Sequence, residues 1–183
     1  DNRFAASRQF TQSISRDGIV SFSIVFEDRA SNKGGVVTST TNESFVVVDI
    51  TPPTLSLVSI TSSNAADTTK ANVGDTITVS ITASEAITTP IVKIAAQDSD
   101  SVTAVASTNG RSYVGVLSLT KNFGGSEGKC GVSVSFQDLA SNAGATQNGV
   151  IGSSVVTIDL TPPTLSSVTI ASSNAAATAR ANN

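Results

Sequence analysis

Residues 124–128 are the first stretch of this chain that could carry out chemistry. They match the G-x-S-x-G pattern of hydrolases in which the central serine, here Ser126, attacks an acyl carbon. That reaction needs a base to accept the serine proton, and the 183-residue sequence contains no histidine. The pattern also needs a turn from a strand into a helix, whereas these glycines lie between two predicted strands. We therefore interpret the stretch as a loop and expect no catalytic residues and no enzyme activity.

Paired Asp and Asn residues offer oxygen atoms that could bind a metal ion. Asp138 and Asn142 follow a predicted strand, and the same pair occurs earlier in the chain as Asp28 and Asn32. In the fold derived below, the later turn faces the segment that carries Asp49. The sequence therefore predicts a calcium site at Asp49, Asp138 and Asn142, because calcium binds carboxylate and amide oxygens. The alternative is that these side chains hydrogen-bond their own backbone and shape the turn, and no other cofactor is expected.

Two single residues also have reactive or modifiable side chains. Cys130 is the only cysteine, so the chain has no internal disulfide, and its alternation places it on the same face as Val132. We interpret it as a small buried hydrophobe; the alternative is a reactive or intermolecular thiol. Asn42 begins the only N-x-Ser/Thr sequence and predicts a glycosylation site if the protein is secreted by a eukaryote.

An internal repeat organises the elements that carry these residues. The pattern Asp-x-Thr-Pro-Pro-Thr-Leu occurs at residues 49–55 and again at residues 159–165, and we call the difference in numbering the repeat offset. The pattern Asp-x-Ala-Ser-Asn recurs at the same offset. A period of about 110 residues is typical of tandem domains. We therefore expect residues 1–50 to be the C-terminal part of one repeat, residues 51–160 a complete repeat, and residues 161–183 the first strand of a third.

Short strands account for the whole of the complete repeat. Residues 76–83 alternate strictly between apolar and polar side chains, which predicts a half-buried strand. Further strands are expected at residues 55–61, 91–96, 102–106, 112–120, 130–136 and 155–160. No stretch has a helical period. Seven short strands with turn signals between them predict an all-β fold, with immunoglobulin-like antiparallel β-sandwich modules in tandem. The expected core residues are Val58, Ile77, Val79, Ile81, Val132, Val134, Phe136 and Ile158.

These motifs, in this order, resemble the tandem bacterial-type immunoglobulin-like repeats of very large surface proteins. The resemblance rests on the Thr-Pro-Pro pattern, on residues 74–87 and on residues 138–142, and it covers essentially the whole chain. Such repeats occur in adhesin stalks and in extracellular fibres, so the resemblance implies a spacer or filament module without catalysis. The sequence departs from the family at Ser31 and Ser141, where glycine is usual, and we expect another backbone turn there.

The junctions between repeats are expected to be stiff. Proline fixes φ and restricts the residue before it, so a strand followed by two prolines and another strand is a short, extended connection. Modules joined in this way should form a rod. The residues that set the junctions are Thr51, Pro52, Pro53, Thr161, Pro162 and Pro163.

Composition narrows the functional classes further. The net charge is −3 and the eleven Lys and Arg residues are scattered, which gives no basic surface for nucleic acid. No apolar run is long enough to span a membrane. We therefore expect a non-catalytic structural protein that forms an extracellular rod, filament or surface appendage, with neighbouring copies or adjoining repeats as partners. The alternative is a spacer or ligand-binding module of a large cell-surface adhesin.

Overall fold

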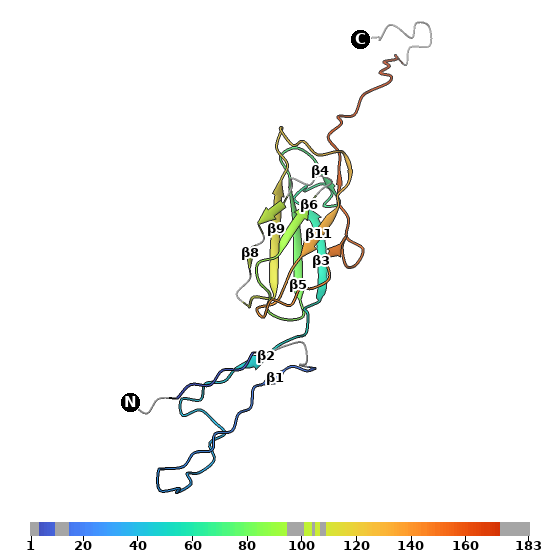
Figure 1. Cartoon of the computed structure of the whole chain (residues 1–183). Helices are drawn as coiled ribbons and strands as arrows, with labels where there is room; N and C mark the ends of the chain where they lie inside the picture. The colour runs from blue at the N-terminus through green and yellow to red at the C-terminus, as the bar shows by residue number, and fades with distance from the viewer. Residues whose placement is uncertain (1–3, 10–14, 95–100, 104, 107–108, 173–183) are drawn as a thin grey trace.

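The computed structural model of this chain describes residues 4–9, 15–94, 101–103, 105, 106 and 109–172 (Figure 1). None of these residues forms a helix. The described part of the chain therefore contains no helix that could cross a membrane. The described residues form thirteen strands: β1 (Gly18–Ile19), β2 (Val47–Val48), β3 (Leu55–Ser62), β4 (Lys70–Ala71), β5 (Thr76–Ala83), β6 (Ile91–Ile94), β7 (Ser101–Thr103), β8 (Val105–Ala106), β9 (Ser112–Ser118), β10 (Gly128–Lys129), β11 (Val132–Ser135), β12 (Gln147–Asn148) and β13 (Thr157–Ile158). The fold class is therefore all-β.

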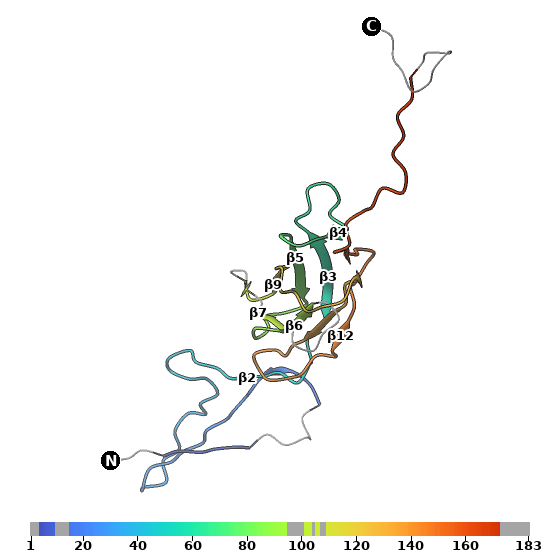
Figure 2. The ribbon, with the colours of Figure 1, turned by 90° about the horizontal axis from the view of Figure 1, so that it is seen from above.

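Residues 51–160, called the central body below, hold the hydrophobic core between two antiparallel sheets. One sheet has the strand order β3-β5-β9-β8 and the other β12-β11-β6-β7 (Figures 1 and 2). A small third sheet, β10-β13-β4, contains one parallel pair, between β13 and β4. Side chains from both large sheets are buried in one cluster, which gives the central body a sandwich-like interior.

Strand β5 shows why these residues form a sheet. Its alternation places Ile77, Val79, Ile81 and Ala83 in the core and its Thr and Ser side chains toward the outside. β-Branched residues pack well on such a pleated, half-buried surface. Seven residue pairs join β5 to β9, and a similar register joins it to β3. The strand with the clearest alternation is thus the centre of its sheet.

The predicted strands of the central body are largely confirmed. The strand predicted at residues 76–83 matches β5 residue for residue, and the one at residues 55–61 is one residue shorter than β3. The strands predicted at residues 91–96 and 102–106 correspond to β6 to β8, except for residues 95, 96 and 104, which lie outside the described residues. The later predicted strands correspond to β9, β11 and β13, which are shorter than expected. The eight expected core residues are all buried, namely Val58, Ile77, Val79, Ile81, Val132, Val134, Phe136 and Ile158.

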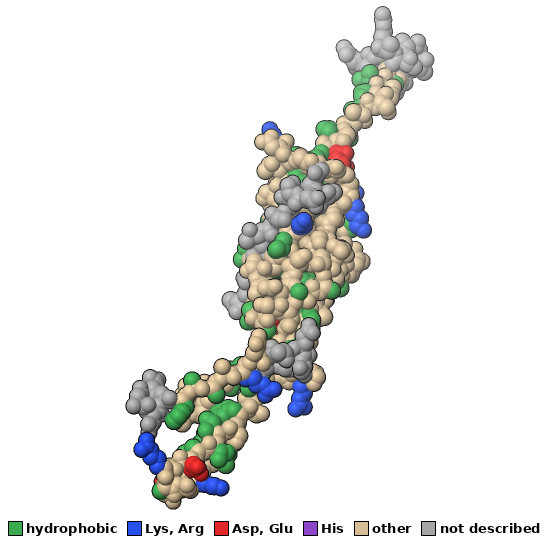
Figure 3. Space-filling view, viewed as in Figure 1, with side chains coloured by type: hydrophobic (Ala, Val, Ile, Leu, Met, Phe, Trp, Pro, Cys, Tyr) green, Lys and Arg blue, Asp and Glu red, His purple; other side chains and the backbone are tan. Residues whose placement is uncertain are grey.

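The leading segment, residues 4–50, has far less regular structure than its sequence pattern predicts. Residues 19–26 alternate between apolar and polar side chains as a half-buried strand does, yet the regular pairing there is limited to β1 and the isolated bridges of Ile24 and Glu27. In the central body the corresponding strand β11 pairs with β6 over four residues. Among the described residues before Thr51, no strand pairs with this stretch as β6 pairs with β11. Apolar side chains therefore gather on its surface, as Figure 3 shows at the lower left.

One loop has the same structure in both copies of the repeat. In the first copy, Asp28 accepts hydrogen bonds from the backbone N–H groups of Ala30 and Asn32 and from the Asn32 side-chain amide. In the second, Asp138 accepts the equivalent bonds from the backbone N–H and side-chain amide of Asn142. The two carboxylates thus hydrogen-bond the backbone of their own turns, which is the alternative to calcium binding that the sequence analysis gave.

The serines of these loops adopt a backbone conformation that glycine favours. Ser31 and Ser141 have φ angles of 64° and 72°. The expectation of another turn at these serines is wrong, because serine occupies the left-handed conformation itself and the bonded Asp and Asn side chains hold it there. Close packing also recurs, since a Cβ atom on Gly34 or Gly144 would lie 2.2 or 2.3 Å from the ring of Phe26 or Phe136.

Core packing gives the first testable prediction. Replacing Ile81 with alanine should lower the free energy of unfolding by about 2–5 kcal/mol, because it leaves a cavity between the sheets. Its neighbour Ser80 points away from the core, so Ser80→Ala should change stability by no more than about 0.5 kcal/mol. Urea unfolding followed by circular dichroism measures both values, and equal effects at the two positions would contradict the assigned faces of β5.

Candidate functional site

The segments around the two Thr-Pro-Pro sequences share a hydrogen-bonded arrangement that we call the carboxylate clamp. At the first, the carboxylate of Asp17 accepts hydrogen bonds from the Ile50 N–H at 2.7 Å and from the Thr51 hydroxyl at 2.5 Å. At the second, Glu127 accepts them from the Leu160 N–H at 2.6 Å and from the Thr161 hydroxyl at 2.8 Å. Asp17 and Glu127 are themselves separated by the repeat offset, so the clamp recurs with the same period as the sequence.

A second carboxylate holds the backbone of each clamped threonine. The N–H of Thr51 donates to Asp49 Oδ1 at 3.1 Å, and that of Thr161 donates to Asp159 Oδ1 at 3.2 Å. Each threonine is therefore fixed through its hydroxyl and its N–H immediately before the first proline. The hydrogen bonds from Thr51 and then from Ile50 hold the pKa of Asp17 below its usual value and outweigh the opposite effect of burial. The clamp thus binds the ionised carboxylate.

The prolines of the first junction are fixed from the other side as well. Pro53 is fully buried, whereas Pro52 is exposed. The next residue, Thr54, donates its N–H to the Ser84 hydroxyl at 3.0 Å, and its carbonyl accepts the Ser84 N–H at 2.8 Å. The chain therefore passes from the clamp into β3 with hydrogen bonds on both sides of the prolines.

At the second junction both prolines are exposed. Pro162 and Pro163 line a shallow pocket of about 360 Å³ together with residues 70–72 and Asn64. The clamp is complete here, but the described residues after Pro163 contain no counterpart of Ser84. Pro163 is therefore exposed where its counterpart Pro53 is buried.

The structure brings the three residues of the predicted calcium site together. Asn142 Nδ2 donates to Asp138 Oδ2 at 2.8 Å and to the Asp49 backbone oxygen at 3.1 Å, and lies 3.5 Å from Asp49 Oδ1. This amide links the loop after β11 to the segment that precedes the prolines. The Asp138 side chain is almost completely buried. Burial raises the pKa of Asp138, but the hydrogen bonds from Asn142, Ala140 and Ser141 together lower it below its usual value.

Glu85 completes a cluster that sequence analysis missed. One carboxylate oxygen from each of Asp49, Glu85 and Asp138 lies within 4.8 Å of the others. Calcium needs six or more oxygen ligands, so three carboxylates and nearby carbonyl groups could supply part of such a set. The Asn142 amide nitrogen already donates to two of these residues. Calcium binding by Asp49, Asp138 and Asn142 stays a prediction.

The remaining candidates from the sequence lie apart from this site. Residues 124–127 lie in the loop between β9 and β10, and Gly128 begins β10. The glutamate in this loop, Glu127, belongs to the second clamp. Cys130 is buried, as predicted. Asn42 is exposed, and its side-chain oxygen accepts a hydrogen bond from the Ser44 hydroxyl at 2.8 Å. Glycosylation of Asn42 also stays a prediction.

The lowered pKa values predict how stability depends on pH. Asp17, Asp28, Asp67 and Asp138 all have pKa values below the usual one in the folded protein. Such groups stabilise the fold fully above their unfolded pKa, and that contribution is lost as pH falls through the folded pKa. The free energy of unfolding should therefore be steady near neutrality and decrease below about pH 4. Denaturant unfolding from pH 7 to pH 2 measures this, and stability that rises on acidification would contradict it.

The calcium prediction has a matched control in the second junction. If the first junction binds calcium, a concentration of 100 times the Kd should stabilise the fold by about 2.7 kcal/mol, and chelator should reverse this. Asp49→Asn should abolish the effect. Asp159→Asn should leave it unchanged, because Asp159 makes the same threonine contact without the counterparts of Glu85 and Asp138 among the described residues. Melting curves that are identical in calcium and chelator would refute the site.

Comparison with known proteins does not extend this description. No protein-family model matches the chain, and no curated protein and no solved structure matches it. Its function must therefore be inferred from the geometry of the two junctions and from the internal repeat.

Proposed function

We propose that this chain is part of a non-catalytic extracellular structural protein. In this proposal, immunoglobulin-like β-sandwich modules recur at the repeat offset, and the Thr-Pro-Pro junctions hold them in a rod, filament or surface appendage. The partners are adjoining repeats or neighbouring copies of the chain. The chemistry of the site is consistent with this role, because its carboxylates are engaged in holding the backbone.

The observation that carries the proposal is the repeated carboxylate clamp. In both clamps the acidic side chain lies immediately before β1 or β10. It accepts a hydrogen bond from a backbone N–H group just after β2 or β13, the last strand of the repeat. The paired strands also recur at the repeat offset, since β1 pairs with β2 as β10 pairs with β13. The same hydrogen bonds at both junctions support a structural role that depends on a fixed geometry of the connection between modules.

The path of the chain through the central body suits a load-bearing role. The leading and trailing segments leave the central body at opposite ends (Figure 1). Tension applied to the ends would enter at β3, which is held along its length by its antiparallel register with β5. Hydrogen bonds in such a ladder lie perpendicular to the strands. Pulling β3 along its axis therefore loads these bonds together instead of one after another.

The proposal predicts that the first junction is stiff. Spin labels at Ser21→Cys and Lys121→Cys, on a Cys130→Val background, would report the distance across it by pulsed electron resonance. The labelled chain with both prolines intact should give a narrow distance distribution. Pro52→Gly with Pro53→Gly should broaden it, because glycine removes the restriction of φ.

The second junction supplies the control for this experiment. Pro162→Gly with Pro163→Gly makes the same chemical change beyond both labels and should leave the distribution unchanged. A distribution that is already as broad in the parent as in the Pro52 and Pro53 variant would refute a rod. The central body should stay folded in all variants, which circular dichroism can check.

A further inference from the structure

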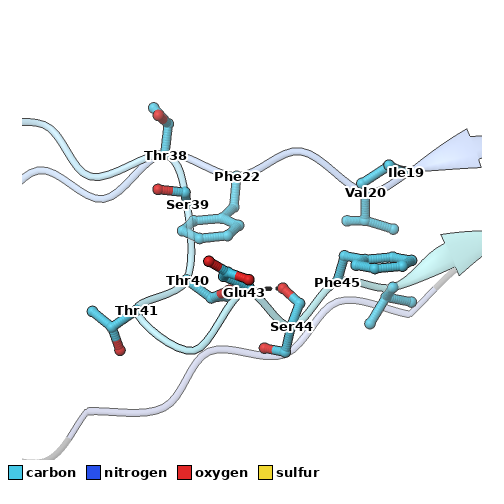
Figure 4. Close-up of a pocket in the computed structure, with 11 residues that line it drawn as sticks. Ile19, Val20, Phe22, Thr38, Ser39, Thr40, Thr41, Glu43, Ser44 and Phe45 are labelled. Atoms are coloured by element: carbon cyan, nitrogen blue, oxygen red, sulfur yellow. Dashed lines mark hydrogen bonds between the residues drawn. The ribbon is translucent and has the colours of Figure 1, made fainter.

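Two Asn-Gly sequences lie in turns of the central body, at residues 109–110 and 148–149. In such a pair the backbone nitrogen of the glycine can attack the side-chain amide carbon of the asparagine, because glycine has no Cβ atom to hinder the approach. The first repeat has Thr38 and Ser39 at the positions of the second pair, on the wall of the pocket in Figure 4. That part of the first repeat therefore has no amide to react.

Exposure and backbone conformation do not distinguish the two pairs. Asn109 and Asn148 are both exposed. The glycine that follows each has a positive φ, which is 65° at Gly110 and 87° at Gly149. A difference in reactivity must therefore come from the hydrogen bonds of the atoms that react, namely the glycine nitrogen and the side-chain oxygen of the asparagine.

The two glycine nitrogens differ in their hydrogen bonds. Gly149 follows β12, and its N–H donates to the Val132 carbonyl at 2.7 Å. In the described part of the chain, the N–H of Gly110 donates no backbone hydrogen bond. An attack on Asn148 must first break a hydrogen bond at the edge of a sheet, whereas the Gly110 nitrogen can turn toward Asn109 without that expense.

The side-chain oxygen of Asn109 is also placed to favour the reaction. It accepts hydrogen bonds from the backbone N–H groups of Arg111 at 2.9 Å and of Ser112 at 3.3 Å. When the Gly110 nitrogen attacks, negative charge develops on this oxygen, and N–H donors that are already in position stabilise such an oxyanion. The turn before β9 therefore favours both partners in the attack.

We propose that Asn109 is a self-modification site, at which the chain slowly converts its own side-chain amide into a carboxylate while Asn148 stays an amide. The Gly110 nitrogen loses its proton to water and forms a bond to Asn109 Cγ. The Cγ–Nδ2 bond then breaks, and Nδ2 takes up a proton and leaves as ammonia. Water hydrolyses the resulting cyclic imide at either of its two carbonyl carbons. The products are aspartate and isoaspartate, and water is the only other reactant.

The position of this turn gives the modification a structural consequence. The Gly110 carbonyl accepts the Ile87 N–H at 3.0 Å, and the Ile87 carbonyl accepts the Tyr113 hydroxyl at 2.6 Å. Ile87 also forms a β-bridge with Asp138, whose loop contacts the first junction. Isoaspartate adds a carbon atom to the backbone of the turn, so it would move the Gly110 carbonyl away from Ile87. The modification would therefore loosen the end of the central body that meets the first junction.

Peptide mapping of the full chain tests the proposal. The chain is incubated in mildly alkaline buffer, with and without denaturing guanidinium chloride, and then cut with trypsin, which separates the two pairs because Arg111 and Lys121 lie between them. Mass spectrometry follows each asparagine. In the folded chain Asn109 should convert about tenfold faster than Asn148, because Gly149 keeps its hydrogen bond. In guanidinium chloride that bond is lost, and the two rates should become similar.

Matched variants identify the source of the ammonia. Asn109→Gln keeps an amide at this position but should stop most of the ammonia release and isoaspartate formation of the folded chain, because the longer side chain would have to close a larger ring. Asn148→Gln makes the same change in the other pair and should leave both unchanged. Both asparagines are exposed, so circular dichroism should show the same fold in both variants.

Two results would overturn the proposal. One is conversion of Asn148 in the folded chain at the same rate as Asn109 or faster, which would show that the hydrogen bond of Gly149 does not protect it. The other is conversion of Asn109 that is strongly slowed by folding, which would show that the turn protects its amide. Neither result bears on the proposed structural role, because the reaction needs only the folded central body.

Discussion

A sheet with one apolar face must have that face covered. The central body meets this requirement and the leading segment does not, and this difference accounts for their different structures. In the central body, β5 and β11 present their apolar faces to each other across a shared core. Among the described residues before Thr51, the strands β1 and β2 pair only with each other, and the other pairings are isolated bridges. The same alternating sequence therefore forms a sheet in one copy and mostly irregular backbone in the other. Strand formation here depends on neighbours more than on propensity.

This dependence explains how much could be predicted from the sequence. β5 was predictable in full, because eight alternating residues leave one choice of inward face. Residues 19–26 alternate almost as well, yet this alternation does not show whether a strand equivalent to β6 lies beside them. The two-residue strands β4, β10 and β12 were missed because a period cannot be recognised in two residues.

The candidate site was predicted in part for a similar reason. The Thr-Pro-Pro sequences and the Asp and Asn pairs stand out because they repeat as identical residues. Asp17 and Glu127 do not, since one copy uses aspartate and the other glutamate, and their bonded partners lie 33 and 34 residues away. Glu85 has no counterpart within the chain. A search for residue type at the repeat offset, instead of identity, would have found the two acids of the clamp.

The loop from Phe136 to Gly144 has a consequence for the order of folding. All its internal hydrogen bonds join residues at most eight positions apart, and its copy in the leading segment forms them without a complete sandwich. Short loops close at little entropic expense, whereas the Asn142 bond to Asp49 spans 93 residues. The loop can therefore form before the body closes, whereas the bond from Asn142 to Asp49 needs both segments in place. In the proposed array, the bond between this loop and the preceding strand end would make the stiffness of each junction depend on the folding of the module that follows it.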